Sequence, residues 1–459
     1  MTDATTLVIL GAGGDLTARL LLPALGQLLT REPSRAVRIV GADREEWTDA
    51  DLESVVRASF ASMDAEDAAS RVDVTYMRTD ITHPDDLRAL LKDCTGQVAL
   101  YFAVPPAVAA ASVATLTPDM LPAGAMLVME KPFGTDEASA EELNRTLTDL
   151  VPESQVFRVD HFLGRSTTLN LLGARFANRI LEPLWSAESI ESVDIVYDES
   201  LALEGRAGYY DKAGALVDMI QSHLLQVLAV LAMEEPATLD EIDFRAATSA
   251  VLRATAVWGD DPAGSSRRAR YTAGEIDGAA KPSYVDEPGV DPDRQTETLA
   301  EATFEVRNAR WAGIPFRLRS GKALGTPARE IVVRFRPVRH LPRGLTGTSD
   351  GAVLRFSLGP DRMSLELNLN ASEDPFELER ATLSAELGEG ALKAYAEVLS
   401  GVLDGDPMLA VRGDAAEQSW RIVAPILEAW RQGDVPLDDY VAGSSGPEGW
   451  PELLSLIHI

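Results

Sequence analysis

The sequence predicts two regions of different fold class, an α/β region with a parallel sheet and an α+β region with a large, mainly antiparallel sheet. In the first 160 residues, apolar segments such as "TLVILGA" and "QVALYFAVPP" alternate with helical segments, which is typical of a doubly wound parallel sheet. From about residue 190, segments such as "EIVVRFRPV" and "MSLELNLN" alternate apolar and polar residues, as in a sheet with one packed face. We therefore expect one domain over 1–165 and a second over 166–459.

The same patterns give the order of the elements. Strands are expected at 6–12, 36–43, 72–80, 97–106, 124–134 and 156–161, and then at 192–201, 330–338, 352–359 and 363–370. Helices are expected at 15–30, 49–62, 83–94, 166–185, 216–233 and 414–432. The segment 258–297 is rich in Gly, Pro, Asp and Ser, which predicts an extended loop.

Composition excludes several classes of protein. The chain has 459 residues and a formal net charge of −30, so we expect neither a nucleic-acid partner nor an anionic membrane surface. The single cysteine, Cys94, excludes an internal disulfide, and we expect no metal site. Neither a basic leader nor an apolar run near the roughly 20 residues of a membrane span is evident, so the expected location is the cytoplasm.

A glycine-rich turn joins the first strand to the first helix. In "LGAGGDL", Gly11, Gly13 and Gly14 lie where backbone N–H groups and a helix N-terminus can receive a pyrophosphate, which favours a Rossmann-like dinucleotide-binding domain. A purely structural turn is the alternative, because a leucine occupies the third position of the strict glycine pattern. After the second strand, Asp43 favours NAD whereas Arg44 favours NADP, so the residues leave the coenzyme open.

Two further strand ends carry ionisable residues. Only six of the 42 basic residues are lysines, and Lys131 in "EKPFGTD" is one of them, which favours a role in the ligand crevice over a surface turn. In "VFRVDHFLGRS", Asp160 and His161 end a strand, Arg165 follows, and Ser166 is the expected N-cap of the next helix. An acid, a histidine and an arginine together indicate an anion-binding and proton-transfer pocket.

The apolar helix expected at 216–233 contains Asp218 and His223. A buried polar side chain needs a partner, and a core histidine bonded to a carbonyl is the simpler alternative to a functional one. Residues five apart lie about 140° apart on an α-helix, so we expect the partner of His223 to come from another segment.

Over nearly its whole length the chain resembles the glucose-6-phosphate dehydrogenase family. The resemblance is carried by "GAGGDL", "EKPFGTD", "RVDHFLG", "RFANRILEPLW", "GRAGYYDKAGALVDMIQSHLLQVLAVLAMEEP", "RWAGIPFRLRSGKAL" and "WRIVAPILEAW". It implies oxidation of glucose 6-phosphate at C1 to 6-phosphogluconolactone in the pentose phosphate pathway, with hydride transfer to NADP or to NAD. It also implies a homodimer or tetramer formed through the outer face of the antiparallel sheet.

The resemblance implies a role for each candidate residue. His223 is expected to be the catalytic base, and Asp160 the carboxylate that orients and charges its imidazole. The expected substrate-binding residues are His161, Arg165, Glu199, Asp218, Lys322 and Lys131. The expected coenzyme-binding residues are Gly11, Gly13, Gly14, Asp15, Leu16, Arg44 and Lys131.

Some positions depart from the family pattern. Phe162 and Arg165 stand where the family usually has a tyrosine and a lysine, and Leu20 and Pro327 stand where lysines are common, with Arg329 close to Pro327. We expect a weakened phosphate site to which Phe162 and Pro327 contribute nothing. The alternatives are a dehydrogenase of an unphosphorylated or different sugar phosphate and a catalytically silent nucleotide-binding regulator, which turnover of any aldose would exclude.

Overall fold

The computed structural model describes residues 5–205, 207–388 and 390–450, which fold into two compact units. Unit 1 takes its described residues from Met1–Arg165, Glu234–Ser249 and Gly390–Trp420. Unit 2 takes its described residues from Ser166–Met233, Ala250–Glu389 and Arg421–Ile459. The second region is therefore not continuous as the sequence suggested, because two of its segments pack with unit 1.

Unit 1 is built on a seven-stranded sheet with the strand order β19-β6-β5-β4-β1-β2-β3. The strands are β1 Thr5–Leu10, β2 Val37–Asp43, β3 Asp73–Arg78, β4 Val98–Phe102, β5 Met126–Glu130, β6 Val156–Val159 and β19 Ala410–Val411. Neighbouring strands are parallel except for β19 and β6, so the predicted parallel sheet is confirmed. The strand order reverses between β1 and β4, which is the crevice where sheets of this kind bind ligands.

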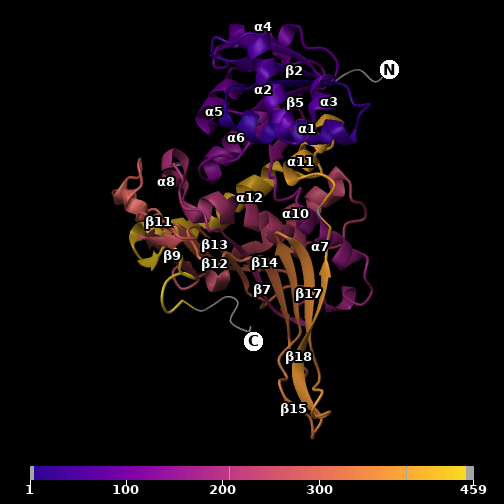
Figure 1. Cartoon of the computed structure of the whole chain (residues 1–459), viewed down its shortest axis with the longest axis vertical. Helices are drawn as coiled ribbons and strands as arrows, with labels where there is room; N and C mark the ends of the chain where they lie inside the picture. Colours follow the sequence, from indigo (N-terminus) through magenta and orange to yellow (C-terminus); the bar gives the residue numbers. More distant parts are fainter. Residues whose placement is uncertain (1–4, 206, 389, 451–459) are drawn as a thin grey trace. The chain divides into compact units, whose positions relative to one another are not determined.

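Helices cover both faces of this sheet, which is why its central strands β1, β4 and β5 are mostly apolar and buried. The helices are η1 Thr17–Leu21, α1 Leu22–Arg31, α2 Asp49–Ala61, α3 Glu66–Ala69, α4 Pro84–Lys92, α5 Pro106–Thr115, α6 Glu137–Leu150 and α11 Ala394–Asp404, with short turns η2 Pro118–Met120 and η3 Glu153–Gln155. Figure 1 shows α11 beside α1, although the two are far apart in the sequence. The buried Ala396, Leu399 and Val402 complete the core on this face, which explains why the C-terminal segment belongs to unit 1.

Unit 2 contains an eleven-stranded sheet ordered β15-β18-β17-β16-β14-β7-β13-β12-β9-β20, with β8 paired to β12. The strands are β7 Ile190–Asp198, β8 Thr255–Val257, β9 Ser266–Thr272, β12 Leu299–Val306, β13 Phe316–Gly321, β14 Arg329–Phe335, β15 Thr346–Gly347, β16 Val353–Leu358, β17 Asp361–Asn370, β18 Glu377–Glu386 and β20 Leu437–Val441. Most pairs are antiparallel; β7–β13, β9–β20 and β15–β18 are parallel. The predicted large, mainly antiparallel sheet is confirmed.

Three local predictions for unit 2 are wrong. The segment 258–297, expected to be a loop, contains β9 and the hairpin of β10 Gly274–Ile276 and β11 Ala279–Lys281. Ala269 and Tyr271 of β9 are buried, but the arginines beside them mask the apolar pattern of this strand in the sequence. The helix expected at 166–185 is shorter, since α7 Ser166–Phe176 is followed by the turn η4 Glu182–Leu184. Ser166 is the first residue of α7 rather than its N-cap, and its hydroxyl donates to the Asp361 carboxylate.

The apolar helix of unit 2 is a core helix. It runs through α8 Ala207–Ala215, η5 Leu216–Leu224 and α9 Leu225–Ala232, and η5 contacts β7, β12 and β13. Among the described residues it is the one helix that is long and apolar enough to cross a membrane, but 89% of its most apolar window is buried in the structure. The expectation that no apolar stretch reaches such a length is therefore wrong, and the burial is typical of a core helix.

Two more helices complete the description. These are α10 Glu241–Ala254 and α12 Gly413–Gln432, together with the short turns η6 Trp258–Asp260, η7 Tyr284–Asp286 and η8 Pro292–Arg294. The observed α12 agrees with the helix predicted at 414–432 to within one residue at its start.

Candidate active site

The stretch η5, which contains Asp218 and His223, is π-helical. Backbone hydrogen bonds of a π-helix join residues five apart, so Asp218 and His223 lie on nearly the same side of η5. The premise that they point about 140° apart holds only for an α-helix and is wrong here. His223 is only 1% exposed, whereas Asp218 is partly exposed.

Two predicted substrate residues meet in unit 2. Glu199 and Lys322 directly follow the parallel strands β7 and β13, and Lys322 Nζ donates to Glu199 Oε2 at 2.6 Å. The backbone N–H of Glu199 also donates to the Gly321 carbonyl at 2.8 Å, which holds the two strand ends together. An acceptor and a donor are thus fixed side by side, as recognition of neighbouring hydroxyl groups requires.

Tyr210 is a residue that the sequence analysis did not single out. Lys322 Nζ lies 5.1 Å from the centroid of its ring, within the range of a cation–π interaction. Tyr210 is buried, and burial raises the pKa of its phenol well above the usual value. Its hydroxyl has no hydrogen-bond partner among the described residues. In the sequence, Tyr210 could have been noticed only from its position in "AGYYDKAG", immediately before the helix expected at 216–233.

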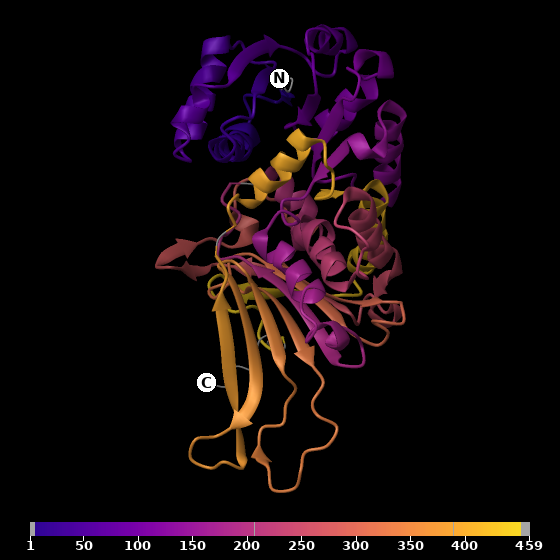
Figure 2. The same ribbon diagram turned by 90° about the vertical axis from the view of Figure 1, so that its right-hand side faces the viewer.

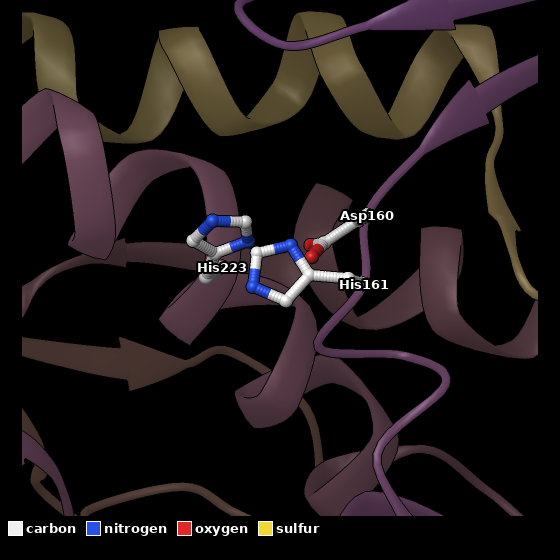
Figure 3. A group of neighbouring side chains, drawn as sticks. All are labelled: Asp160, His161 and His223. Carbon is white, nitrogen blue, oxygen red and sulfur yellow. The ribbon is translucent and has the colours of Figure 1, made fainter. Parts of the chain in front are cut away.

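Asp160 and His161 directly follow β6 in unit 1, as predicted. Figure 3 shows their side chains at consecutive positions after this strand, and His223 on its own helix. Asp160 is 2% exposed, and its Oδ1 accepts the backbone N–H of Phe162 at 2.9 Å. Burial raises the pKa of Asp160 to about 6, although His161, the Phe162 N–H and the cations Lys131 and Arg165 oppose the shift. Its carboxylate therefore titrates close to neutral pH.

Phe162 holds Arg165 in place. The guanidinium carbon of Arg165 lies 4.3 Å from the centroid of the Phe162 ring, and the ring itself is buried. A planar guanidinium stacks on an aromatic face better than an ammonium does. Phe162 thus offers no polar group to a phosphate, but its ring positions the guanidinium of Arg165.

The other departures from the family pattern lie elsewhere. Leu20 is 48% exposed on η1, and Pro327 is exposed on the segment before β14. Arg329 donates to the Asp198 carbonyl at 3.2 Å and lies 5.1 Å from the ring centroid of Tyr197, so its guanidinium is held at the end of β7.

A carboxylate missed by the sequence analysis lies beside Lys131. Glu130 accepts hydrogen bonds from the hydroxyls of both Tyr101 and Tyr395, and burial raises its pKa. The His161 ring stacks on Tyr395, with 6.1 Å between the centroids and 27° between the planes. This network supports Lys131 and His161 from within unit 1. In the sequence, the glutamate of "EKPFG" is the one feature that indicates this network.

The glycine turn fits a pyrophosphate. Gly11 has φ of 93°, and a Cβ atom there would overlap the Ala103 carbonyl, so the turn requires glycine. The Thr17 hydroxyl donates to the Gly11 carbonyl at 2.9 Å and ties the turn to the helix. Asp15 and Leu16 open that helix, where backbone N–H groups lack acceptors within the helix. These N–H groups, at the switch point of the sheet, could hold an anionic phosphate.

Asp43 is engaged in the protein itself. Its carboxylate accepts the backbone N–H groups of Gly13 at 3.0 Å and of Arg44 at 2.7 Å. Asp43 therefore shapes the glycine turn, whereas the Arg44 side chain is exposed at the end of β2. On the neighbouring strand, Arg78 donates to the Arg44 carbonyl at 3.1 Å. A cation at this position favours a coenzyme that carries a 2′-phosphate.

The dinucleotide fingerprint of unit 1 and the strand-end and helix residues of unit 2 define a nicotinamide-dependent oxidoreductase. Residues 8–170 match the family described as "Glucose-6-phosphate dehydrogenase, NAD binding domain", and residues 172–456 match "Glucose-6-phosphate dehydrogenase, C-terminal domain". The chain belongs to the glucose-6-phosphate dehydrogenase family.

Relatives match over nearly the whole chain. A glucose-6-phosphate 1-dehydrogenase of Gluconobacter oxydans is 39% identical, with 98% of this chain and 95% of the relative covered. One of Bacillus subtilis is 34% identical, with 98% and 96% covered. A solved glucose-6-phosphate dehydrogenase in complex with its substrate glucose 6-phosphate is similar with a TM-score of 0.85 and 30% identity, covering 97% of this chain and 96% of that one.

The exposed cation at the end of β2 leads to a prediction about coenzyme choice. We expect Arg44→Ala to weaken NADP binding by about 10- to 100-fold, because a charge-assisted hydrogen bond contributes about 1.5–3 kcal/mol. NAD binding should change little. Arg57→Ala, which removes an exposed arginine of α2, is the matched control. Dissociation constants of both coenzymes measure the effect, and equal losses for the two would show that Arg44 does not contact the 2′-phosphate.

Proposed function

We propose that this chain oxidises glucose 6-phosphate at C1 to 6-phosphogluconolactone, with NADP as the preferred coenzyme and NAD as an alternative. The observation that carries the proposal is the match of both units, over nearly the whole chain, to glucose-6-phosphate 1-dehydrogenases. The single cysteine and the buried apolar helix support a location in the cytoplasm, where this reaction would belong to the pentose phosphate pathway.

In the proposed mechanism His223 is the base. Oxidation at C1 requires the proton of the C1 hydroxyl to leave as hydride departs from the carbon, and a neutral imidazole suits this transfer near neutral pH. When bound, the coenzyme accepts that hydride. Asp160 pairs with the imidazole and stabilises the imidazolium once the proton has arrived. Asp160 can do so only while it is charged, and burial raises its pKa to about 6, so its contribution is lost as the pH falls through that value.

The remaining residues bind the substrate. Glu199 and Lys322 form an ion pair at adjacent strand ends and would exchange part of that contact for sugar hydroxyls. Asp218, partly exposed on the same side of η5 as the base, would accept a further hydroxyl. His161 and the stacked Arg165 would bind the phosphate, and Lys131 would contact both ligands from the end of β5.

We also propose a homodimer, itself able to pair into a tetramer, formed through the long strands of unit 2. Figure 2 shows β17 and β18 extending beyond the helices that cover the rest of this unit. One face of this extension is largely apolar, apart from Glu379 opposite Leu369: Leu369 and Leu383 are 50% and 58% exposed, and Phe376 between the strands is 63% exposed. The opposite face contains the ion pair of Arg380 and Glu366. A second copy of the chain would cover the apolar face.

The proposed base can be tested directly. We expect His223→Asn to lower kcat by about 10²- to 10⁴-fold, as for loss of a general base, with coenzyme binding unchanged. Asp160→Asn should cost less, because the imidazole remains. His83→Asn, an exposed histidine before α4, is the control and should be fully active. A His223→Asn variant with near-normal turnover would show that the base lies elsewhere.

The phosphate site gives a second test. We expect kcat/KM to be much higher for glucose 6-phosphate than for glucose, and Arg165→Ala to lower the value for the phosphate ester by about 10- to 100-fold, as expected for a charged hydrogen bond of about 1.5–3 kcal/mol. Phe162→Ala should give part of the same loss, since it removes the stacking surface. Arg145→Ala, an exposed residue of α6, controls for surface charge. Equal kcat/KM for the two sugars would assign the site to an unphosphorylated substrate.

The dimer can be tested with neighbouring residues on opposite faces of β18. Leu383 pairs with Leu365 on the apolar face, whereas Ser384 pairs with Ser364 on the polar face. We expect Leu383→Asp to give a monomer in light scattering at micromolar concentration, because it buries a charge in the interface. Ser384→Asp should leave the assembly intact. A monomeric unmodified chain would refute the proposal.

A further inference from the structure

A buried carboxylate closes the start of the helix that contains Asp218 and His223. Glu297 lies on the segment before β12 and is 7% exposed. Its Oε1 accepts the backbone N–H of Leu216, the first residue of η5, at 2.9 Å. Its backbone carbonyl accepts the N–H of Ala215 at 3.3 Å. The side chain and the main chain of one residue thus hold two successive N–H groups of this helix.

Gly214 makes this approach sterically feasible. It interrupts the helical backbone between α8 and η5 with φ of 67°, a value that favours glycine. A Cβ atom at this position would overlap the carboxylate of Glu297. The break in the helix and the carboxylate that fills it therefore depend on each other.

Burying a carboxylate at this position lowers the stability of the folded protein. Burial raises the pKa of Glu297 to about 7, against the opposing effects of the Leu216 and Ala215 N–H groups and of Arg268. Arg268 is itself directed to carbonyls, with its Nε 3.1 Å from the Val435 oxygen. An apolar residue of similar size would avoid the cost of burying an acid. What an apolar residue cannot supply is the acceptor for the first amide of η5.

We infer that Glu297 is a positioning residue for the reaction, because it fixes the start of η5 and thereby the placement of Asp218 and His223. The inference rests on the proposed function in taking His223 as the base. A helix moves as a unit, so a shift of its first turn displaces both side chains together. Displacements of about 1 Å at a reacting group lower rates by up to about 10²-fold.

The first experiment compares two substitutions of Glu297. We expect Glu297→Leu to lower kcat by about 10- to 100-fold while the dissociation constant of NADP is unchanged, because only the placement of the base is affected. Glu297→Gln keeps an oxygen acceptor for the Leu216 N–H. With a pKa of about 7, the site already tolerates an uncharged carboxyl group, so the Gln variant should stay within a few-fold of the unmodified enzyme.

Glu301→Leu is the matched control. Glu301 is another buried carboxyl group of unit 2, on β12, whose pKa is also raised by burial, but its charged neighbours are Arg317, Arg319 and Arg267 rather than a helix start. Its removal should leave kcat close to normal. If Glu301→Leu lowered kcat as much as Glu297→Leu, the effect would be a general one of removing a buried acid, and the inference would be overturned.

The second experiment uses Gly214→Ala, which should displace the carboxylate and reproduce the loss of kcat. Because both changes remove one interaction, the double variant with Glu297→Leu should lose less than the product of the single losses. A fully multiplicative double variant, a Gln variant as impaired as the Leu variant, or a Leu variant with normal kcat would each overturn the inference. Should the Leu variant fail to fold, Glu297→Gln and Gly214→Ala still decide between the outcomes. Normal turnover of His223→Asn would instead show that the base lies elsewhere, whereas an unmodified chain that does not oxidise glucose 6-phosphate would refute the proposed function.

Discussion

Burial of the helix Ala207–Ala232 against the sheet of unit 2 is the constraint on which the rest of the site depends. An apolar helix packed in this way gains stability from its Leu, Val and Ala side chains, whereas burying a polar group on it costs stability unless that group is hydrogen-bonded within the protein. The π-helical turns of η5 bring its acid and its histidine to one side, and the strand ends of β7 and β13 supply an ion pair in the same unit. The placement of the polar residues is therefore a property of the core.

In unit 1, backbone N–H groups rather than buried side chains lie at the candidate site. A parallel sheet covered on both faces leaves only its edges and strand ends for ligands, and the reversal of strand order between β1 and β4 opens one such end. There the glycine turn presents N–H groups, and Asp43 accepts two of the neighbouring ones to keep the turn in shape. Asp43, which the sequence pattern linked to the choice of coenzyme, therefore stabilises the backbone of the glycine turn.

Elements with strong periodicity could be predicted from the sequence, and contacts between distant segments could not. The strands of unit 1 and the alternating strands β14 and β17 were recognisable because their patterns repeat over several residues. The strand β9 was not, since its charged residues gave it the composition of a loop, and the buried Arg268 is directed to the Val435 carbonyl only in the folded protein. The π-helical geometry of η5 has no signature in residue type, and the pairings of Glu130 with Tyr395 and of Glu297 with Leu216 join residues more than 80 positions apart. Such contacts follow from the tertiary fold.

The arginine stacked on Phe162 has a consequence for covalent modification. Lysine ammonium groups are targets of acetylation, which removes their charge, whereas a guanidinium retains its charge under the same conditions. Position 165 carries a guanidinium held against a buried ring, and Lys322, buried in its ion pair with Glu199, is shielded from reagents in solution. The charges at these two positions, one in each unit, are thereby resistant to acylation and do not vary with the supply of reactive acyl donors in the cell.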